Sequence, residues 1–210
     1  MAWAIAATMA SAALAVWLRR GRYRQPRDEP RLNLHWWWAT PVLTGVGDAL
    51  LGATGTLATA PATSLLYLVG GVAIAIIDLD VHRIPNRILI LWSAPTLAVL
   101  ILEYTTNGTG SAALNRAVLG GAALALLYLL FAVVASMGLG DVKLAALTGA
   151  VLAAQSWRHI ILGTMAAFAA AAIVAGSLLA SGRGRRNDHL AFGPAIVIGA
   201  VMAINLGGVL

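Results

Sequence analysis

Two aspartates, Asp78 and Asp141, stand at the edges of long hydrophobic runs in this chain. A carboxylate at the centre of a membrane helix costs about 2.5–3.5 kcal/mol, so an acid beside such a run is a candidate functional residue. Two acids that share a site hold one proton between them, because both cannot ionise cheaply. The ionised member can take a proton from water while the protonated member polarises a carbonyl. This pattern therefore predicts acid–base hydrolysis that needs neither cysteine nor metal.

The composition indicates that the elements around these acids lie in a membrane. Of the 210 residues, 60% are hydrophobic and 10% are charged, whereas soluble domains are about 45–50% apolar and 25% charged. Cysteine is absent, which excludes disulfides and thiolate zinc sites. The net charge of +6 would suit a nucleic-acid partner, but the basic residues lie in short loops between apolar runs, as membrane orientation signals do. We expect no nucleic-acid partner.

We predict an all-α, polytopic transmembrane bundle of about eight spans, within a range of six to eight, because about 20 apolar residues cross a bilayer as a helix. Residues 1–210 would form a single membrane-embedded domain. In it, residues 1–60 would hold two N-terminal spans and a basic cytoplasmic loop at 19–36, and residues 61–210 would be the catalytic core. Val142–Ala154 is short enough to be a partly embedded helix instead. The predicted spans are Ala2–Leu18, Trp37–Ala58, Thr63–Asp78, Ile88–Tyr104, Ala113–Ser136, Val142–Ala154, Ile160–Ala180 and Leu190–Val209.

The distribution of basic residues predicts the orientation of these spans. Arginines follow the first apolar run, opposite to the order in a cleavable signal peptide, so we expect a retained first span with its N-terminus outside. All but two of the 14 Lys and Arg residues then fall on the cytoplasmic side, the exceptions being Arg116 and Arg158. Asp78 and Asp141 would lie at this cytoplasmic face, joined by a helical hairpin that returns the chain to the same side.

Three short motifs resemble those of the prepilin peptidase family, the type IV leader peptidases, which are GxGD-type aspartyl proteases. Asp78 to Asn86 is similar to the family's first motif, an Asp followed by basic and apolar residues and Ile-Pro-Asn. Gly138 to Leu144 matches the Gly-x-Gly-Asp-x-Lys-Leu motif, and Phe192 to Gly199 is similar to a third element, Phe-Gly-Pro with an apolar run ending in Gly. Gly-x-Gly-Asp alone is a weak signal, but three ordered motifs make a specific resemblance over roughly residues 65–210.

The resemblance implies an aspartic-type endopeptidase that cleaves the leader of type IV prepilins or pseudopilins at the cytoplasmic face of the bacterial plasma membrane. Asp78 and Asp141 would be the catalytic pair, and no metal or other cofactor is implied. The implied partners are the prepilin or pseudopilin substrates, membrane lipid, and pilus or secretion machinery. The residues that would bind substrate or shape the site are Gly138, Gly140, Lys143, Pro85, Asn86, Phe192, Gly193 and Pro194.

Larger members of that family carry a cysteine-bearing cytoplasmic domain near the N-terminus, associated with N-methylation of the new terminus. Here the corresponding loop is only residues 19–36 and has no cysteine. The chain therefore resembles a short form of the family, and we expect no methyltransferase activity.

Other interpretations remain open from the sequence alone. A presenilin-like intramembrane protease also uses Gly-x-Gly-Asp, and a proton-coupled transporter could use intramembrane acids as a relay. Asp141 could instead cap a helix N-terminus.

Among the remaining charges, we expect Asp80 to be an interfacial residue paired with Arg83, and Lys143 to hold a substrate carboxylate or lipid phosphate or to anchor at the interface. Two further acids, Asp48 and Glu103, are expected to be loop or boundary charges. Glycines at 138 and 140 would permit close backbone approach and unusual dihedral angles beside Asp141.

Overall fold

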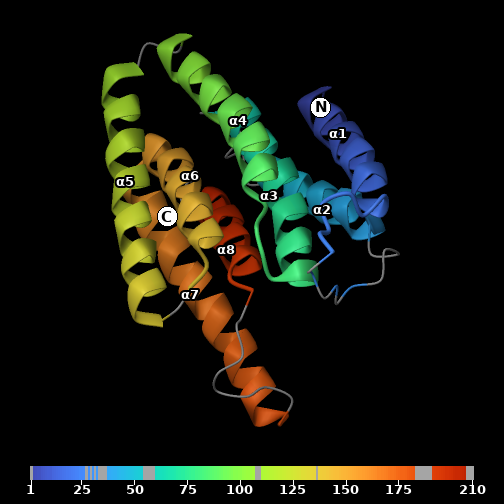
Figure 1. The fold of residues 1–210 in the computed structure, drawn as a ribbon. Coiled ribbons are helices and arrows are strands. Elements are labelled where there is room, and N and C mark those ends of the chain that lie inside the picture. Colours follow the sequence, from blue (N-terminus) through green and yellow to red (C-terminus); the bar gives the residue numbers. More distant parts are fainter. Residues whose placement is uncertain are drawn as a thin grey trace.

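The computed structural model describes residues 2–26, 28, 30, 32, 37–53, 60–106, 110–135, 137–182 and 191–206. These residues form eight α-helices and no strand (Figure 1). The predicted all-α bundle is confirmed, and each predicted span overlaps one helix. In chain order the helices are α1 (Ala2–Arg19), α2 (Ala39–Ala53), α3 (Pro61–Val81), α4 (Asn86–Thr106), α5 (Gly110–Ala135), α6 (Leu139–Gln155), α7 (Trp157–Ala180) and α8 (Gly193–Leu206).

Four of the described helices, α3, α4, α5 and α7, are long and apolar enough to cross a membrane. The most apolar stretch of α3 is 83% buried inside the protein, against 22–28% for the same measure in the other three. α3 is therefore the central helix, and α4, α5 and α7 present most of their apolar surface outward. Helices α2, α6 and α8 have 15, 17 and 14 residues, so at 1.5 Å per residue they are about 21–26 Å long.

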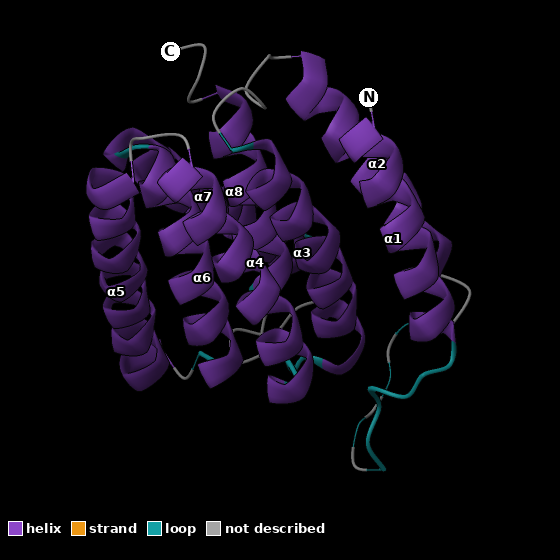
Figure 2. Cartoon of the chain, turned by 90° about the horizontal axis from the view of Figure 1, so that it is seen from above, coloured by secondary structure: helices purple, strands orange, loops and turns teal. Residues whose placement is uncertain are grey.

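The helices form one bundle with α5 at one side and α1 and α2 at the other, as both views of the chain show (Figures 1 and 2). α3 lies between these sides and packs against α1, α2, α4, α6 and α8. α5 packs most extensively on α6, and α7 on α8. The helices that begin or end at the two candidate acids, α3, α6 and α8, all contact one another in this centre.

Glycine allows the closest of these helix pairs to form. A side chain at Gly149 of α6 would collide with the backbone of Gly120 on α5, and one at Gly199 of α8 would collide with the backbone of Gly163 on α7. Small residues let transmembrane helices approach until their backbones touch, which strengthens dispersion contacts where lipid competes for apolar surface. These two glycine contacts fix how far α5 stands from α6 and α7 from α8.

A tight turn separates α3 from α4. His82 closes α3 in a left-handed conformation, with φ of 48°, and its N–H donates to the carbonyl of Asp78 at 2.8 Å. Pro85 then precedes α4, and its carbonyl accepts the N–H of Leu89 at 3.1 Å. Proline suits a helix start, where its missing N–H costs least. Pro85 and Asn86 thus lie where α4 begins, four residues or more after the end of α3.

Candidate active site

Asp78 lies in the last turn of α3 and is only 4% exposed. Its Oδ2 accepts the backbone N–H of Gly193, the first residue of α8, at 2.9 Å. A Cβ at position 193 would stand 2.8 Å from this oxygen, so only glycine lets α8 begin so close to the carboxyl group. The positive end of a helix favours an anion. α8 therefore both holds Asp78 and stabilises a negative charge on it.

Asp141 lies in the first turn of α6 and is 7% exposed. It is not the helix N-cap, because Gly138 occupies that position and no side chain caps the helix. Its Oδ1 is buried and has no hydrogen-bond partner. The carboxyl groups of Asp141 and Asp78 are close enough for their charges to interact. The structure thus brings the two acids together from helices 63 residues apart in sequence, since the hairpin of α4 and α5 returns the chain to the same end of the bundle.

The turn between α3 and α4 packs directly on the start of α6. A Cβ at Gly140 would lie 2.9 Å from Cβ of Ile84, so glycine is required there for close approach. The Lys143 ammonium donates to Oδ1 of Asn86 at 2.8 Å, which bridges the first turns of α6 and α4. Three predicted site residues, Asn86, Gly140 and Lys143, therefore lie at this contact, and Pro85 and Gly138 are close to them in sequence.

One part of the glycine prediction is wrong. Among the described glycines only Gly21 and Gly182 have positive φ, so Gly138 and Gly140 do not adopt left-handed backbone. Gly138 is extended, with φ of −66° and ψ of 137°, and Gly140 is already helical. Gly140 serves the close approach of Ile84 rather than an unusual dihedral angle, and Gly138 lies beside Oδ2 of Asp141.

An aromatic cluster flanks the acids on the side of α5 and α7. Phe192, just before α8, contacts Tyr128 at 5.8 Å and Phe168 at 5.4 Å between ring centroids. Tyr128 is 1% exposed and lies within electrostatic range of Asp141. The next residue after Gly193, Pro194, occupies the second position of α8. The sequence indicated Phe192 through its motif, but Tyr128 sits in an apolar run that carries no local signal.

A buried polar contact also joins α3 and α6 away from the acids. The hydroxyls of Tyr67 and Thr148 are 2.7 Å apart, and both side chains are buried. Tyr67 is fully enclosed, so this bond fixes the register of the two helices that carry Asp78 and Asp141. Sequence reasoning did not identify this pair.

The expected pair of Asp80 with Arg83 is wrong. Asp80 is fully buried and binds Arg24 at 2.8 Å, whereas Arg83 binds Asp28 at 2.7 Å. The period of a helix explains the difference: Asp80 lies on the face of α3 that meets the segment after α1, and Arg83 lies beyond the end of the helix. The sequence indicates Arg24 as one of several orientation signals, so this structural role was missed.

Two other acids, Glu103 and Asp48, lie within helices rather than in loops. Glu103, in the last turns of α4, accepts the N–H groups of Ala62 and Thr63 at 2.8 and 3.0 Å and so caps the start of α3. Asp48 is 5% exposed within α2, and neither of its carboxylate oxygens has a hydrogen-bond partner. Asp48 is therefore neither a loop nor a boundary charge, whereas Glu103 lies near the end of α4, as expected of a boundary charge.

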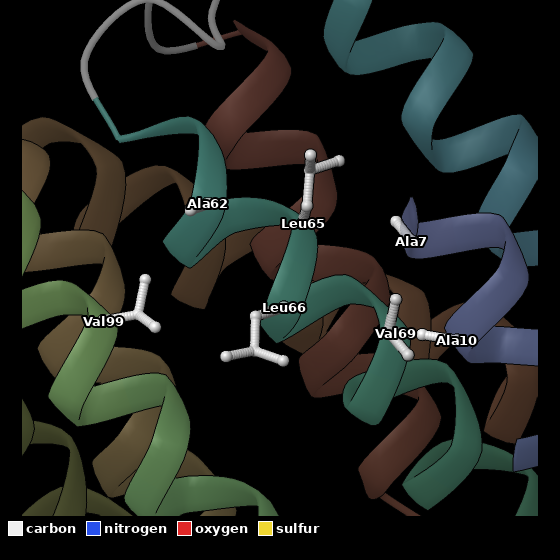
Figure 3. Close-up of a pocket in the computed structure, with 7 residues that line it drawn as sticks. All are labelled: Ala7, Ala10, Ala62, Leu65, Leu66, Val69 and Val99. Atoms are coloured by element: carbon white, nitrogen blue, oxygen red, sulfur yellow. The ribbon is translucent and has the colours of Figure 1, made fainter. Parts of the chain in front are cut away.

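Apolar cavities lie away from the two acids. One of about 230 Å³ opens between α1, α3 and α4 and is lined by alanine, leucine and valine side chains (Figure 3). A second, of about 310 Å³, shares Val69 with it and continues along α3 to Ile77. Both face α1 and α4, while Asp78 faces α8. No cluster of three His, Cys, Asp or Glu side chains that could hold a metal occurs among the described residues.

Residues 65–180 of the chain match the type IV leader peptidase family. No curated protein and no solved structure matches the chain. The matched region contains Asp78, Asp141 and the motif residues around each of them, while Gly193 and the whole of α1 and α2 lie outside it. It covers more than half of the sequence. The chain therefore belongs to the type IV leader peptidase family.

Proposed function

We propose that the protein is an aspartyl endopeptidase that cleaves the leader peptide of type IV prepilins or pseudopilins at the cytoplasmic face of the bacterial plasma membrane. The observation that carries the proposal is the convergence of two buried carboxyl groups, Asp78 and Asp141, from the ends of α3 and α6. Membership of a leader peptidase family supports a prepilin-like substrate. Membrane lipid and the pilus or secretion machinery are the other proposed partners.

The surroundings of the two acids suggest different roles for them. Asp78 accepts the N–H of Gly193 at the positive end of α8, which favours its ionised form. Asp141 is buried beside the charge of Asp78, and its Oδ1 has no hydrogen-bond partner, which favours the protonated form of this residue. Asp78 is then the base that takes a proton from water, and Asp141 is the acid that donates to the peptide carbonyl.

Hydrolysis follows with this assignment. The water oxygen attacks the peptide carbon while its proton passes to Asp78 and the Asp141 proton passes to the carbonyl oxygen. As the tetrahedral intermediate collapses, the C–N bond breaks, the proton held by Asp78 reaches the leaving nitrogen, and a hydroxyl proton of the intermediate returns to Asp141. The remaining motif residues support this geometry: Gly140 admits Ile84, Gly193 admits Asp78, and Lys143 bridges to Asn86.

The test is peptide cleavage by the purified full chain in detergent micelles. The substrate is a synthetic peptide with a basic leader, a glycine and an apolar segment, and products are measured by mass spectrometry with a metal chelator present. We expect Asp78→Asn and Asp141→Asn each to lower kcat at least about a hundredfold, the usual contribution of a positioned acid or base. Asp48→Asn is the matched control, since Asp48 is also a buried acid but lies in α2.

The outcomes separate the possibilities. Full cleavage by Asp78→Asn or Asp141→Asn would remove that residue from the pair. Activity that appears only after a divalent metal is added would contradict an acid pair acting on water. Loss of cleavage in the Asp48→Asn control as well would show that any buried acid is needed for folding, and the pair would lose its support.

A further inference from the structure

The segment that follows α1 is fastened to the turn that follows Asp78. Here the clasp segment means the described residues 20–26, 28, 30 and 32. Asp80, on the last turn of α3, receives four hydrogen bonds from it and has no exposed surface. Its Oδ2 accepts the Tyr23 hydroxyl at 2.7 Å and Arg24 Nε at 2.8 Å, while its Oδ1 accepts Arg24 Nη2 at 3.0 Å and the N–H of Leu32 at 2.8 Å. Both oxygens of this carboxylate are thus held by the clasp segment.

A second ion pair joins the same two regions, with the acid and the arginine exchanged between them. Arg83, just after α3, donates to both oxygens of Asp28 at 2.7 and 3.0 Å. The N–H of Gln25 also donates to Asp28 at 2.6 Å, which orients this carboxylate within the clasp segment. Each side therefore supplies one acid and one guanidinium group. Arg24 binds its carboxylate through two nitrogens, Nε and Nη2, which fixes orientation as well as distance, whereas Arg83 donates from Nη2 alone.

The Tyr23 hydroxyl and the Asp28 carboxylate of the clasp segment keep their protonation states over the pH range of an enzyme assay. Burial, and then the contact with Asp80, raises the pKa of Tyr23 to about 12, so its hydroxyl remains a donor. Burial acts to raise the pKa of Asp28, but the hydrogen bonds from Arg83 and Gln25 outweigh it and leave the pKa below its usual value. A lowered acid pKa stabilises the fold above the ordinary pKa and is lost only as the pH falls through the shifted value. Near neutral pH the clasp is therefore fully formed.

The turn held by the clasp contacts Asp78 directly and Gly140, the neighbour of Asp141. Asp80 follows Asp78 by two residues, and the N–H of His82 binds the Asp78 carbonyl at 2.8 Å. Ile84 then packs against Gly140, the residue directly before Asp141. The five residues from Asp80 to Ile84 thus stand between the clasp segment on one side and both carboxyl-bearing helix ends on the other.

Stability alone does not account for a buried ion pair at this position. Apolar side chains of similar volume stabilise a buried site as well as an ion pair does, or better, because the ions lose their hydration. What Asp80 and Arg24 add over an apolar contact is fixed geometry: two parallel hydrogen bonds and a third from Tyr23 allow one arrangement of the turn. An active site whose groups must meet within a fraction of an ångström requires such a support.

We propose that the clasp segment is part of the catalytic machinery, with Asp80 as a positioning residue that acts through Tyr23 and Arg24. It would hold the last turn of α3 and, through Ile84, the first turn of α6, so that Asp78 and Asp141 face each other. The proposal rests on the proposed function of these two acids. It gives a role to a segment that lies outside residues 65–180, the region that matches the family.

The experiment measures kcat and KM of the full chain in detergent with the synthetic peptide described above. Tyr23→Phe removes one hydroxyl, Arg24→Lys keeps the charge but removes the fork, and Asp80→Asn keeps the shape but removes the charge. We expect kcat to fall roughly tenfold to a hundredfold in Arg24→Lys and Asp80→Asn, less in Tyr23→Phe, with KM unchanged, because displacement of catalytic groups by about 1 Å has effects of this size. Arg158→Lys is the matched control, the same substitution at an exposed arginine in the first turn of α7, outside the clasp segment.

A charge exchange tests positioning independently of those three variants. Asp28→Arg and Arg83→Asp should each lower kcat, and the double variant Asp28→Arg/Arg83→Asp should restore most of it, because the pair re-forms with reversed polarity. Thermal unfolding of every variant gives the folded fraction at the assay temperature. The proposal is overturned if the clasp variants keep the wild-type kcat, if the double exchange rescues nothing, or if the losses vanish once rates are corrected for folded fraction.

These results are distinguishable from a failure of the proposed function. Full cleavage by Asp78→Asn would contradict the acid pair itself, whatever the clasp variants do. Loss of cleavage in Asp78→Asn together with wild-type kcat in Arg24→Lys and Asp80→Asn would leave the acid pair intact and contradict the clasp alone.

Discussion

At the scale of single residues, the contact between Asp78 and Gly193 leaves less room for a side chain than any other glycine contact in the candidate site. The carboxyl group and the start of α8 approach until there is no room for a methyl group, since a Cβ would stand 2.8 Å from Oδ2 and 3.2 Å from Cγ of Asp78. Real Cβ atoms essentially never make contacts this short, so any side chain at position 193 must displace the acid or the helix.

We therefore expect Gly193→Ala to lower kcat roughly tenfold or more with little change in KM, because the displaced group acts in the reaction rather than in substrate binding. Peptide cleavage measures this directly. Gly45→Ala is the control, since a Cβ at Gly45 of α2 meets nothing within 4 Å and should leave kcat unchanged. A wild-type kcat in Gly193→Ala would mean that Asp78 tolerates movement and is not held for catalysis.

The sequence predicted some residues of the site and not others for an identifiable reason. Asp78, Asp141 and Gly193 lie in short motifs, so their types and spacing carried information before any fold was known. Tyr128 and Tyr67 lie within continuous apolar runs, where a tyrosine is unremarkable until the neighbouring helix is placed. Arg24 was hidden differently: arginines near a span end are explained by orientation alone, and its partner is 56 residues away.

At the scale of helices, length and hydropathy predicted the elements but not their partners. A helix that is apolar on every side carries no preferred face, so the pairing of α5 with α6 could not be read from periodicity. Some observed helix boundaries differ from the predicted ones. α6 begins at Leu139 rather than Val142, because its first turn contains Gly140 and Asp141, which do not continue the apolar run. That shift places Asp141 inside α6, the helix that packs most extensively on α5.

The close contact of α5 and α6 gives a prediction for stability. Gly149→Ala should destabilise the protein by about 2 kcal/mol, or roughly 4–8 °C in melting temperature for a chain of this size, because the new methyl group collides with the Gly120 backbone. Unfolding is followed by the fluorescence of the seven tryptophans. Gly176→Ala in α7 is the control, since its Cβ would meet nothing. Equal melting temperatures of the two variants would show that the helices separate without cost.

At the scale of the whole molecule, the helix ends that carry the proposed catalytic groups lie at one end of the bundle. The end of α3 and the starts of α6 and α8 meet there, and the clasp segment and the turn before α4 close around them. The opposite ends of α3 and α4 are held by Glu103, which caps α3 with no acid pair nearby. The described basic residues follow the same division, because Arg24, Arg83 and Lys143 lie at the end of the acids and Arg116 and Arg158 lie at the other end. The orientation rule and the site geometry therefore bear on the same face.

This coincidence predicts which side of the membrane each end faces. The chain has no cysteine, so a single introduced thiol reports its own position without background. In intact cells, a maleimide that cannot cross the membrane should label Arg158→Cys, at the exposed start of α7, and should leave Arg22→Cys in the clasp segment unlabelled. Inverted membrane vesicles should give the reverse result, because they expose the cytoplasmic side. Labelling of Arg22→Cys from outside intact cells would place Asp78 and Asp141 at the outer face, where a cytoplasmic leader could not reach them, and would contradict the proposed site of cleavage.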